Sequence, residues 1–233
     1  MVLRKKWLTM LTVLTTVLIL GACGTNKDSG QTVEDSIYDN PRNHTAEDFM
    51  PLSEALEKYP VWFKAKVYPT RKTTVKDVYV FENGYATHYW NLKSLPIDEY
   101  DDLSDDEIIK YVKENSTAKA TGKYILDITL DELGQSTQEI EVVLENGIME
   151  YYYPKGYNLD GEILTEEKTS TEVTDYLVNF EQGSNSQKIF NTTYSGLAYN
   201  KDFSLFTRVD DSFVGFKLDD PDTKNDKVTI EGK

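Results

Sequence analysis

The chain has 233 residues, 39% of them hydrophobic and 12% aromatic, with a formal net charge of −15 at pH 7. The aromatic content is too high for a wholly disordered chain, and the length allows one ordinary domain or two small ones. The acidic balance offers no basic stripe of the kind that binds nucleic acid, so nucleic-acid partners are excluded.

The first 22 residues have the parts of an export signal. Arg4, Lys5 and Lys6 precede an uncharged, mostly apolar stretch from Trp7 to Leu20. At about 1.5 Å rise per residue, this stretch is shorter than a hydrocarbon core of roughly 30 Å. It therefore predicts a signal peptide, residues 1–22, rather than a membrane span. Its removal takes away three positive charges and leaves a mature chain of net charge −18.

The signal ends in Leu20-Gly21-Ala22-Cys23, which resembles the bacterial lipobox. That resemblance implies cleavage before Cys23 and a diacylglycerol attached to its sulfur. Two acyl chains anchor a protein stably, whereas one chain binds reversibly. We therefore expect a lipoprotein on the extracytoplasmic face of the cell membrane. Because Cys23 is the only cysteine, no intramolecular disulfide is possible, and its lipidation would also remove cysteine-based zinc sites and cysteine–histidine catalysis. No cofactor is implied.

Residues 24–50 are polar and small, which predicts a flexible tether of the kind usual in Gram-positive lipoproteins. A short helix is expected at 53–59, before Pro60. A half-buried strand follows at 61–67, because apolar residues alternate with polar ones. The stretches 75–81 and 85–91 flank Glu82-Asn83-Gly84, and Asn-Gly is the strongest short hairpin signal.

The clearest helix is expected at 104–115. Ser104 and Glu107 have the spacing of a capping box, and Leu103 and Ile108 that of a hydrophobic staple. After it come a strand at 124–131 and a second expected hairpin, 140–144 with 148–153, around Glu145-Asn146-Gly147. Laying 61–90 over 124–153 aligns both turns. Chance convergence on Asn-Gly and a true duplication remain equally open.

The C-terminal part gives weaker signals. Residues 169–182 fit a helix or a strand equally well, and 183–187 read as a polar loop. Short strands are expected at 188–193, 203–209 and 212–218. The predicted fold is mainly β (α+β): two strand–loop–hairpin units separated by a short helix, then further antiparallel strands. The units span 51–120 and 121–233, or together form one continuous domain.

Few residues have the pattern of a catalytic or metal site. His88 lies in an expected strand without a cysteine, serine or histidine partner, which favours a structural role. Carboxylates cluster at 101–107, at Asp127 with Asp131, and at 219–226. None of these clusters has the spacing of a calcium loop, so no metal site is predicted.

The tyrosines are more informative. Since neighbouring strand residues face opposite ways, Tyr151-Tyr152-Tyr153 must expose at least one ring. Such rings can stack on sugars or anchor a protein partner, although cross-strand packing would also explain them. The candidate ligand-binding aromatics are Tyr89, Trp90, Tyr151 and Tyr153.

Residues 60–220 resemble surface lipoproteins of Bacillota. The resemblance lies in the tryptophan-containing strand, the helix start Leu-Ser-Asp-Asp-Glu-Ile-Ile and the repeated hairpin, and it brings no activity with it. The leading hypothesis is a non-enzymatic, membrane-anchored binding module with a cell-wall or protein partner. The alternatives are a glycan- or peptidoglycan-binding surface protein and a carboxylate-based cell-wall hydrolase, which would need two carboxylates about 5–10 Å apart.

Overall fold

The computed structural model describes residues 44–230, all of which lie in one compact unit. The expected signal peptide, Cys23 and tether residues 24–43 lie outside the described residues. The end of the expected tether does have defined structure, because a 3-10 helix η2 (Ala46–Asp48) leads into β1 (Met50–Pro51). Strand β1 pairs in parallel with β14 (Phe216–Lys217).

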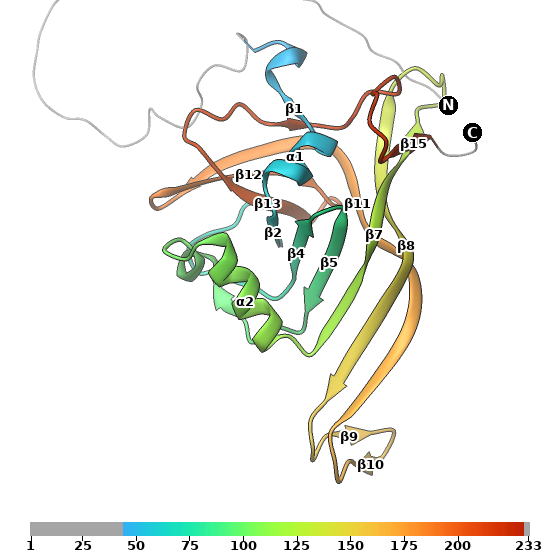
Figure 1. Cartoon of the computed structure of the whole chain (residues 1–233). Coiled ribbons are helices and arrows are strands. Elements are labelled where there is room, and N and C mark those ends of the chain that lie inside the picture. The colour runs from blue at the N-terminus through green and yellow to red at the C-terminus, as the bar shows by residue number, and fades with distance from the viewer. Residues whose placement is uncertain (1–43, 231–233) are drawn as a thin grey trace, which may run out of the picture. The chain divides into compact units, whose positions relative to one another are not determined.

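The fold is mainly β, as expected from the sequence, and is dominated by one nine-stranded sheet (Figure 1). Its strands are β2 (Val61–Lys66), β4 (Val78–Glu82), β5 (Tyr85–Trp90), β7 (Ala118–Leu130), β8 (Thr137–Tyr153), β11 (Lys168–Ile189), β12 (Thr192–Ala198), β13 (Phe203–Val209) and β15 (Val228–Ile230).

All of these strands except β15 form a closed antiparallel ring. Each pairs with the next along the chain, and β13 returns to pair with β2 through Phe206 and Phe63. Strand β15 joins the side of β7 that β5 leaves free, in parallel from Val228 to Ile230. Both expected units therefore contribute to a single closed sheet.

Side chains on the two faces of the ring form two apolar clusters. The inner cluster contains Trp62, Tyr79 and Phe81, together with Leu52, Ala55 and Leu56 of α1 (Leu52–Lys58). The outer cluster contains Phe63 and Val80, packed beneath Ile108, Ile109 and Val112 of α2 (Asp105–Asn115). The strand at 61–66 is therefore buried on both faces, whereas its alternation predicted one solvent-facing side.

Both expected helices are confirmed. Helix α1 receives a cap from far along the chain, because the Asp219 carboxylate accepts bonds from Ser53 N at 2.8 Å and Ser53 Oγ at 2.5 Å. Helix α2 begins with the predicted capping box, in which Ser104 Oγ accepts a bond from Glu107 N at 3.3 Å. It follows the 3-10 helix η3 (Ile97–Tyr100). No helix within residues 44–230 is both long and apolar enough to cross a membrane.

The first Glu-Asn-Gly is a hairpin turn as predicted, but the second is not. Asn83 and Gly84 have φ values of 53° and 78°, and join β4 to β5. Glu145-Asn146-Gly147 instead lies within β8, where the register with β7 shifts between Thr121 and Lys123. Gly147 is needed for close approach, because an added Cβ would lie 2.3 Å from the Thr174 carbonyl oxygen. The second expected hairpin is therefore wrong, and a β-bulge takes its place.

The C-terminal expectations are corrected in part. Residues 169–182 are strand, within β11, and the expected loop at 183–187 continues that same strand. The expected strand at 188–193 is broken at Phe190, whose φ is 59°, where the chain turns from β11 into β12. Of 212–218, only β14 is strand, while 203–209 is confirmed as β13.

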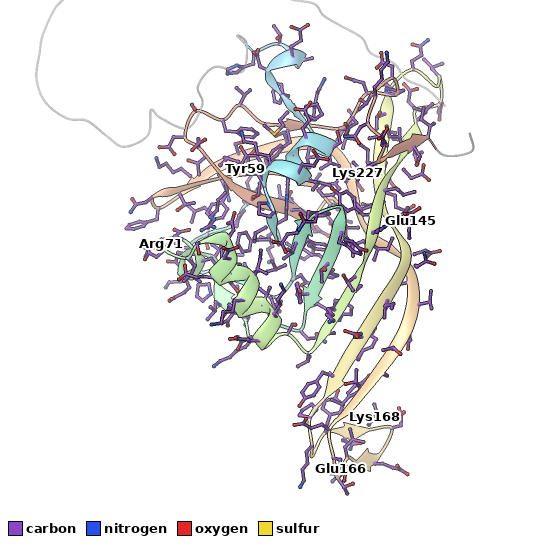
Figure 2. All side chains as sticks on the ribbon, in the orientation of Figure 1. Tyr59, Arg71, Glu145, Glu166, Lys168 and Lys227 are labelled. Atoms are coloured by element: carbon purple, nitrogen blue, oxygen red, sulfur yellow. The ribbon has the colours of Figure 1, made fainter. Side chains whose placement is uncertain are left out.

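Residues 148–173 of the β8–β11 hairpin form what we call the arm. It pairs with β7 at Ile148–Tyr151, and the rest of it extends beyond the other strands (Figure 1). Glu166 and Lys168 lie at its far end (Figure 2). Between β8 and β11, the short strands β9 (Asn158–Leu159) and β10 (Glu162–Ile163) pair with each other. A separate two-stranded sheet is formed by β3 (Thr74–Val75) and β6 (Leu95–Pro96). Among the described residues, β11 pairs with β12 only from Glu181 onward, so its second edge is unpaired along the arm.

Candidate functional site

The inner face of the sheet carries a continuous row of aromatic rings. We call it the aromatic row. It runs from β4 through β5 and β8 to the tip of the arm, and its members are Tyr79, His88, Trp90, Tyr151, Tyr153 and Tyr157.

The first hairpin fixes the start of the row. Because the Asn83-Gly84 turn places Glu82 opposite Tyr85, Tyr79 falls opposite His88. Their rings stack, with centroids 4.0 Å apart and planes 5° from parallel. Trp90 lies two residues after His88 and so faces the same side, with ring centroids 4.8 Å apart.

Small residues on β7 allow the row to cross from β5 to β8. Ala118 pairs with Trp90 on one side and with Tyr151 on the other, and Ala120 pairs with His88 and Met149 in the same way. Over the short Ala118 side chain, the Trp90 and Tyr151 rings meet edge to face at 5.7 Å. Both alanines are buried, so the rings cover the strand between them.

The row becomes more accessible toward the tip of the arm. Tyr79 is 1% exposed, whereas Tyr157 is 46% exposed. Between them, Trp90, Tyr151 and Tyr153 are half-buried. The Tyr151 and Tyr153 rings lie 6.4 Å apart and 17° from parallel, and Tyr153 to Tyr157 spans 5.3 Å. The outer part of the row is therefore a strip open to solvent and not a closed cavity.

Polar residues of β11 flank this strip. Lys168 pairs with Tyr153, Ser170 with Tyr151 and Glu172 with Met149, so all three side chains share the inner face of the arm. Burial raises the pKa of the Tyr151 hydroxyl, and Glu172 and Tyr153 raise it further. Tyr151 is therefore a neutral hydrogen-bond donor at neutral pH. Its hydroxyl donates to Met149 Sδ at 2.7 Å.

His88 has a partner that sequence analysis did not identify. Its Nε2 lies 3.0 Å from Asp77 Oδ1, and its side chain is 17% exposed. Burial lowers the pKa of His88, although the Asp77 carboxylate opposes that shift. Burial alone would raise the pKa of Asp77, but the His88 hydrogen bond and nearby positive charges lower it overall. At neutral pH the ring is therefore neutral, with its Nε2 proton on the side of the Asp77 carboxylate.

Three of the four predicted aromatics are brought together and one is not. Trp90, Tyr151 and Tyr153 lie in the row, whereas Tyr89 faces the opposite side and is 5% exposed in the outer cluster. Tyr79, His88 and Tyr157 were missed. The hairpin register could have identified the first two, since a two-residue turn at Asn83-Gly84 fixes which residues of its strands are opposite.

The carboxylate clusters have structural partners. Asp105 pairs with Arg208, and Asp101 accepts a bond from the Tyr194 hydroxyl at 2.6 Å. Asp131 binds Ser136 within its own turn, and Asp219 caps α1. Among residues 44–230, no group of three or more acidic, histidine or cysteine side chains is arranged to hold a metal ion.

Comparison with known proteins found no matching family model, no matching curated protein and no matching solved structure.

Proposed function

We propose that this chain is an exported, lipid-anchored binding protein whose aromatic row binds an extended glycan at the cell surface. The observation that carries the proposal is the solvent-accessible strip of Trp90, Tyr151, Tyr153 and Tyr157 along the inner face of the arm. The lipobox around Cys23 supports the anchoring and the location.

The strip offers partners for both the apolar faces and the polar edges of a sugar ring. Sugar rings present C–H groups on their faces, which stack on aromatic rings, and hydroxyls around their edges. The hydroxyls can bond to the side chains of Lys168, Ser170 and Glu172, which lie beside the tyrosines on the same face.

The open shape of the strip favours a chain-like ligand over a small molecule. The second edge of β11 has no neighbouring strand along the arm among the described residues, so that side of the inner face is not enclosed by the sheet. The ring interior itself is filled by large side chains, including Trp62, Tyr79 and Phe180, which are at most 1% exposed. A ligand would therefore lie along the arm.

The test compares two neighbouring tyrosines. The full-length protein is incubated with purified cell-wall glycan, and binding is measured for the wild type, Tyr153→Ala and Tyr152→Ala. Tyr152 is the matched control, since it lies next along β8 but on the outer face, 41% exposed. Loss of one stacking ring is worth about 1–2 kcal/mol, so Tyr153→Ala is expected to bind roughly 5–30-fold more weakly.

Tyr152→Ala is expected to bind like the wild type, and a thermal melt of each variant checks that the fold is intact. Equal binding by all three proteins would refute the proposal. Release of soluble glycan fragments by the wild type would point instead to a cell-wall hydrolase.

A further inference from the structure

A pocket with an excess of lysines lies beside the buried end of the aromatic row. We call it the lysine pocket. It has a volume of about 530 Å³, within the usual range for small-molecule sites. Its charged wall residues are four lysines and one carboxylate: Lys64, Lys66, Lys72, Lys76 and Asp77. This local excess of positive charge stands out in a chain whose formal net charge is −15.

Carboxylates of the fold neutralise these lysines only in part. Within residues 44–230, Lys66, Lys72 and Lys76 make no ion pair, and Lys64 instead lies over the rings of Tyr199 and Phe203, at 4.5 Å and 5.5 Å. The single acidic wall residue, Asp77, offsets part of this charge, because Lys64 and Lys76 both interact electrostatically with it; it also bonds His88 at 3.0 Å. The pocket therefore retains positive charge that an anion could neutralise.

The pocket and the aromatic row are directly connected. Asp77 lines the pocket, and its partner His88 is the second ring of the row. From His88 the row continues to Trp90 at 4.8 Å and then onto the arm. A sugar ring stacked on Trp90 would therefore lie one side chain away from the His88–Asp77 pair that borders the pocket.

The surrounding acidity does not prevent anion binding here. At physiological ionic strength the Debye length is about 8 Å, so exposed carboxylates farther away are largely screened, whereas the lysines would be in contact with an anion in the pocket. Four ammonium groups against one carboxylate exceed what a single carboxylate ligand neutralises. Thr74, which also lines the pocket, supplies a hydroxyl donor for an additional oxygen. Both features favour a phosphate group.

We propose that the lysine pocket binds a phosphate group of the ligand, so that the ligand of the aromatic row is a phosphate-bearing glycan. The second half of this statement rests on the function proposed above, whereas phosphate binding by the pocket does not.

The first experiment tests the pocket alone. Binding of inorganic phosphate to the full-length protein is measured by calorimetry for the wild type, the double variant Lys66→Gln/Lys76→Gln, and Lys110→Gln. Lys110 is an exposed lysine on α2 outside the pocket. The double variant is expected to bind at least tenfold more weakly and Lys110→Gln like the wild type. No phosphate binding, or equal binding by all three, would overturn the inference.

The second experiment tests which ligand carries the phosphate. Glucose 6-phosphate, glucuronate and vesicles containing phosphatidylglycerol are compared as probes. Glucose 6-phosphate is expected to bind best, with a lysine-dependent affinity. Tighter binding of glucuronate would overturn the choice of phosphate, and lysine-dependent binding to vesicles alone would overturn the choice of a glycan.

Failure of the inference and failure of the proposed function have different results. If Tyr153→Ala loses wall-glycan binding while Lys66→Gln/Lys76→Gln keeps it, the proposed function stands and a phosphate-bearing glycan is ruled out as its ligand. If the lysine variant loses phosphate binding while Tyr153→Ala leaves wall-glycan binding unchanged, the pocket is a phosphate site and the glycan function fails.

Discussion

The two Glu-Asn-Gly segments offer a controlled comparison, because one tripeptide has two structural roles. Gly84 has a φ of 78° and open space around it, so Gly84→Ala adds only backbone strain. Placing an L-residue other than Gly in the left-handed region costs about 1–2 kcal/mol. Asn tolerates that region better than Ala, so Gly84→Asn should be the milder change.

Gly147 should respond in the opposite way. It does not have a left-handed φ, but an added Cβ would lie 2.3 Å from the Thr174 carbonyl oxygen and 2.7 Å from Leu144 Cβ. Since the first of these atoms is backbone, β8 and β11 must separate. Overpacking of this kind costs about 1–3 kcal/mol or more, and the larger Asn should cost more than Ala.

Thermal denaturation separates the two roles. For a domain of this size, 1 kcal/mol shifts Tm by roughly 2–4 °C. Gly147→Ala is therefore expected to lower Tm by roughly 2–12 °C, and Gly147→Asn by more, whereas Gly84→Asn should melt above Gly84→Ala. If Asn were better tolerated than Ala at position 147 as well, the bulge would be behaving as a turn and the reasoning would be wrong.

Three further predictions concern the Asp219 cap of α1, the bonds between Arg208 and the segment before α2, and the expected lipid attachment at Cys23. Burial raises the pKa of Asp219 despite its bonds from Ser53, so its contribution to stability is complete below pH 3.8 and is lost as the pH rises through the raised pKa. The destabilisation by Asp219→Asn should therefore shrink from pH 3.5 to pH 7 in urea unfolding, and a growing difference would contradict this. Arg208 donates hydrogen bonds to the carbonyls of Tyr100 and Leu103, which precede α2. Arg208→Met should therefore lower the free energy of unfolding, measured in urea, by about 2–3 kcal/mol. An unchanged value would mean that water replaces these bonds at no cost. Cys23→Ala should abolish lipid labelling and leave the precursor unprocessed on a gel, and normal labelling would rule out Cys23 as the anchor.

Local signals predicted the local structure well. The Ser104–Glu107 capping box and the Asn83-Gly84 turn depend on neighbours in sequence, and both form as expected. The same reasoning failed at Gly147, because the close approach of β11 decides that conformation and sequence periodicity does not report it. Phe190 likewise has a positive φ at the turn between β11 and β12, a conformation that a phenylalanine in the sequence does not predict.

The candidate site was predicted only in part, for a related reason. Three consecutive tyrosines implied that the rings alternate between faces, and Tyr151 and Tyr153 do share one face. Tyr89 was misplaced because the inner face of β5 is the one that carries His88 and Trp90. The contact between the Trp90 and Tyr151 side chains depends on Ala118, which pairs with β5 on one side and with β8 on the other. These pairings could not be predicted without knowing the order of the strands in the sheet.

Closure of the ring between β2 and β13 has a consequence for how the chain folds. Phe63 can pair with Phe206 only after nearly the whole chain has been made. The hydrogen bonds between Ser53 and Asp219 need a similarly distant segment of the chain. Contacts this distant in sequence make folding slow, because loop-closure entropy is lost before they form. If the chain is exported as we propose, this order of events would help it remain unfolded while it passes through a narrow translocation channel, and the sheet would close only on the far side of the membrane.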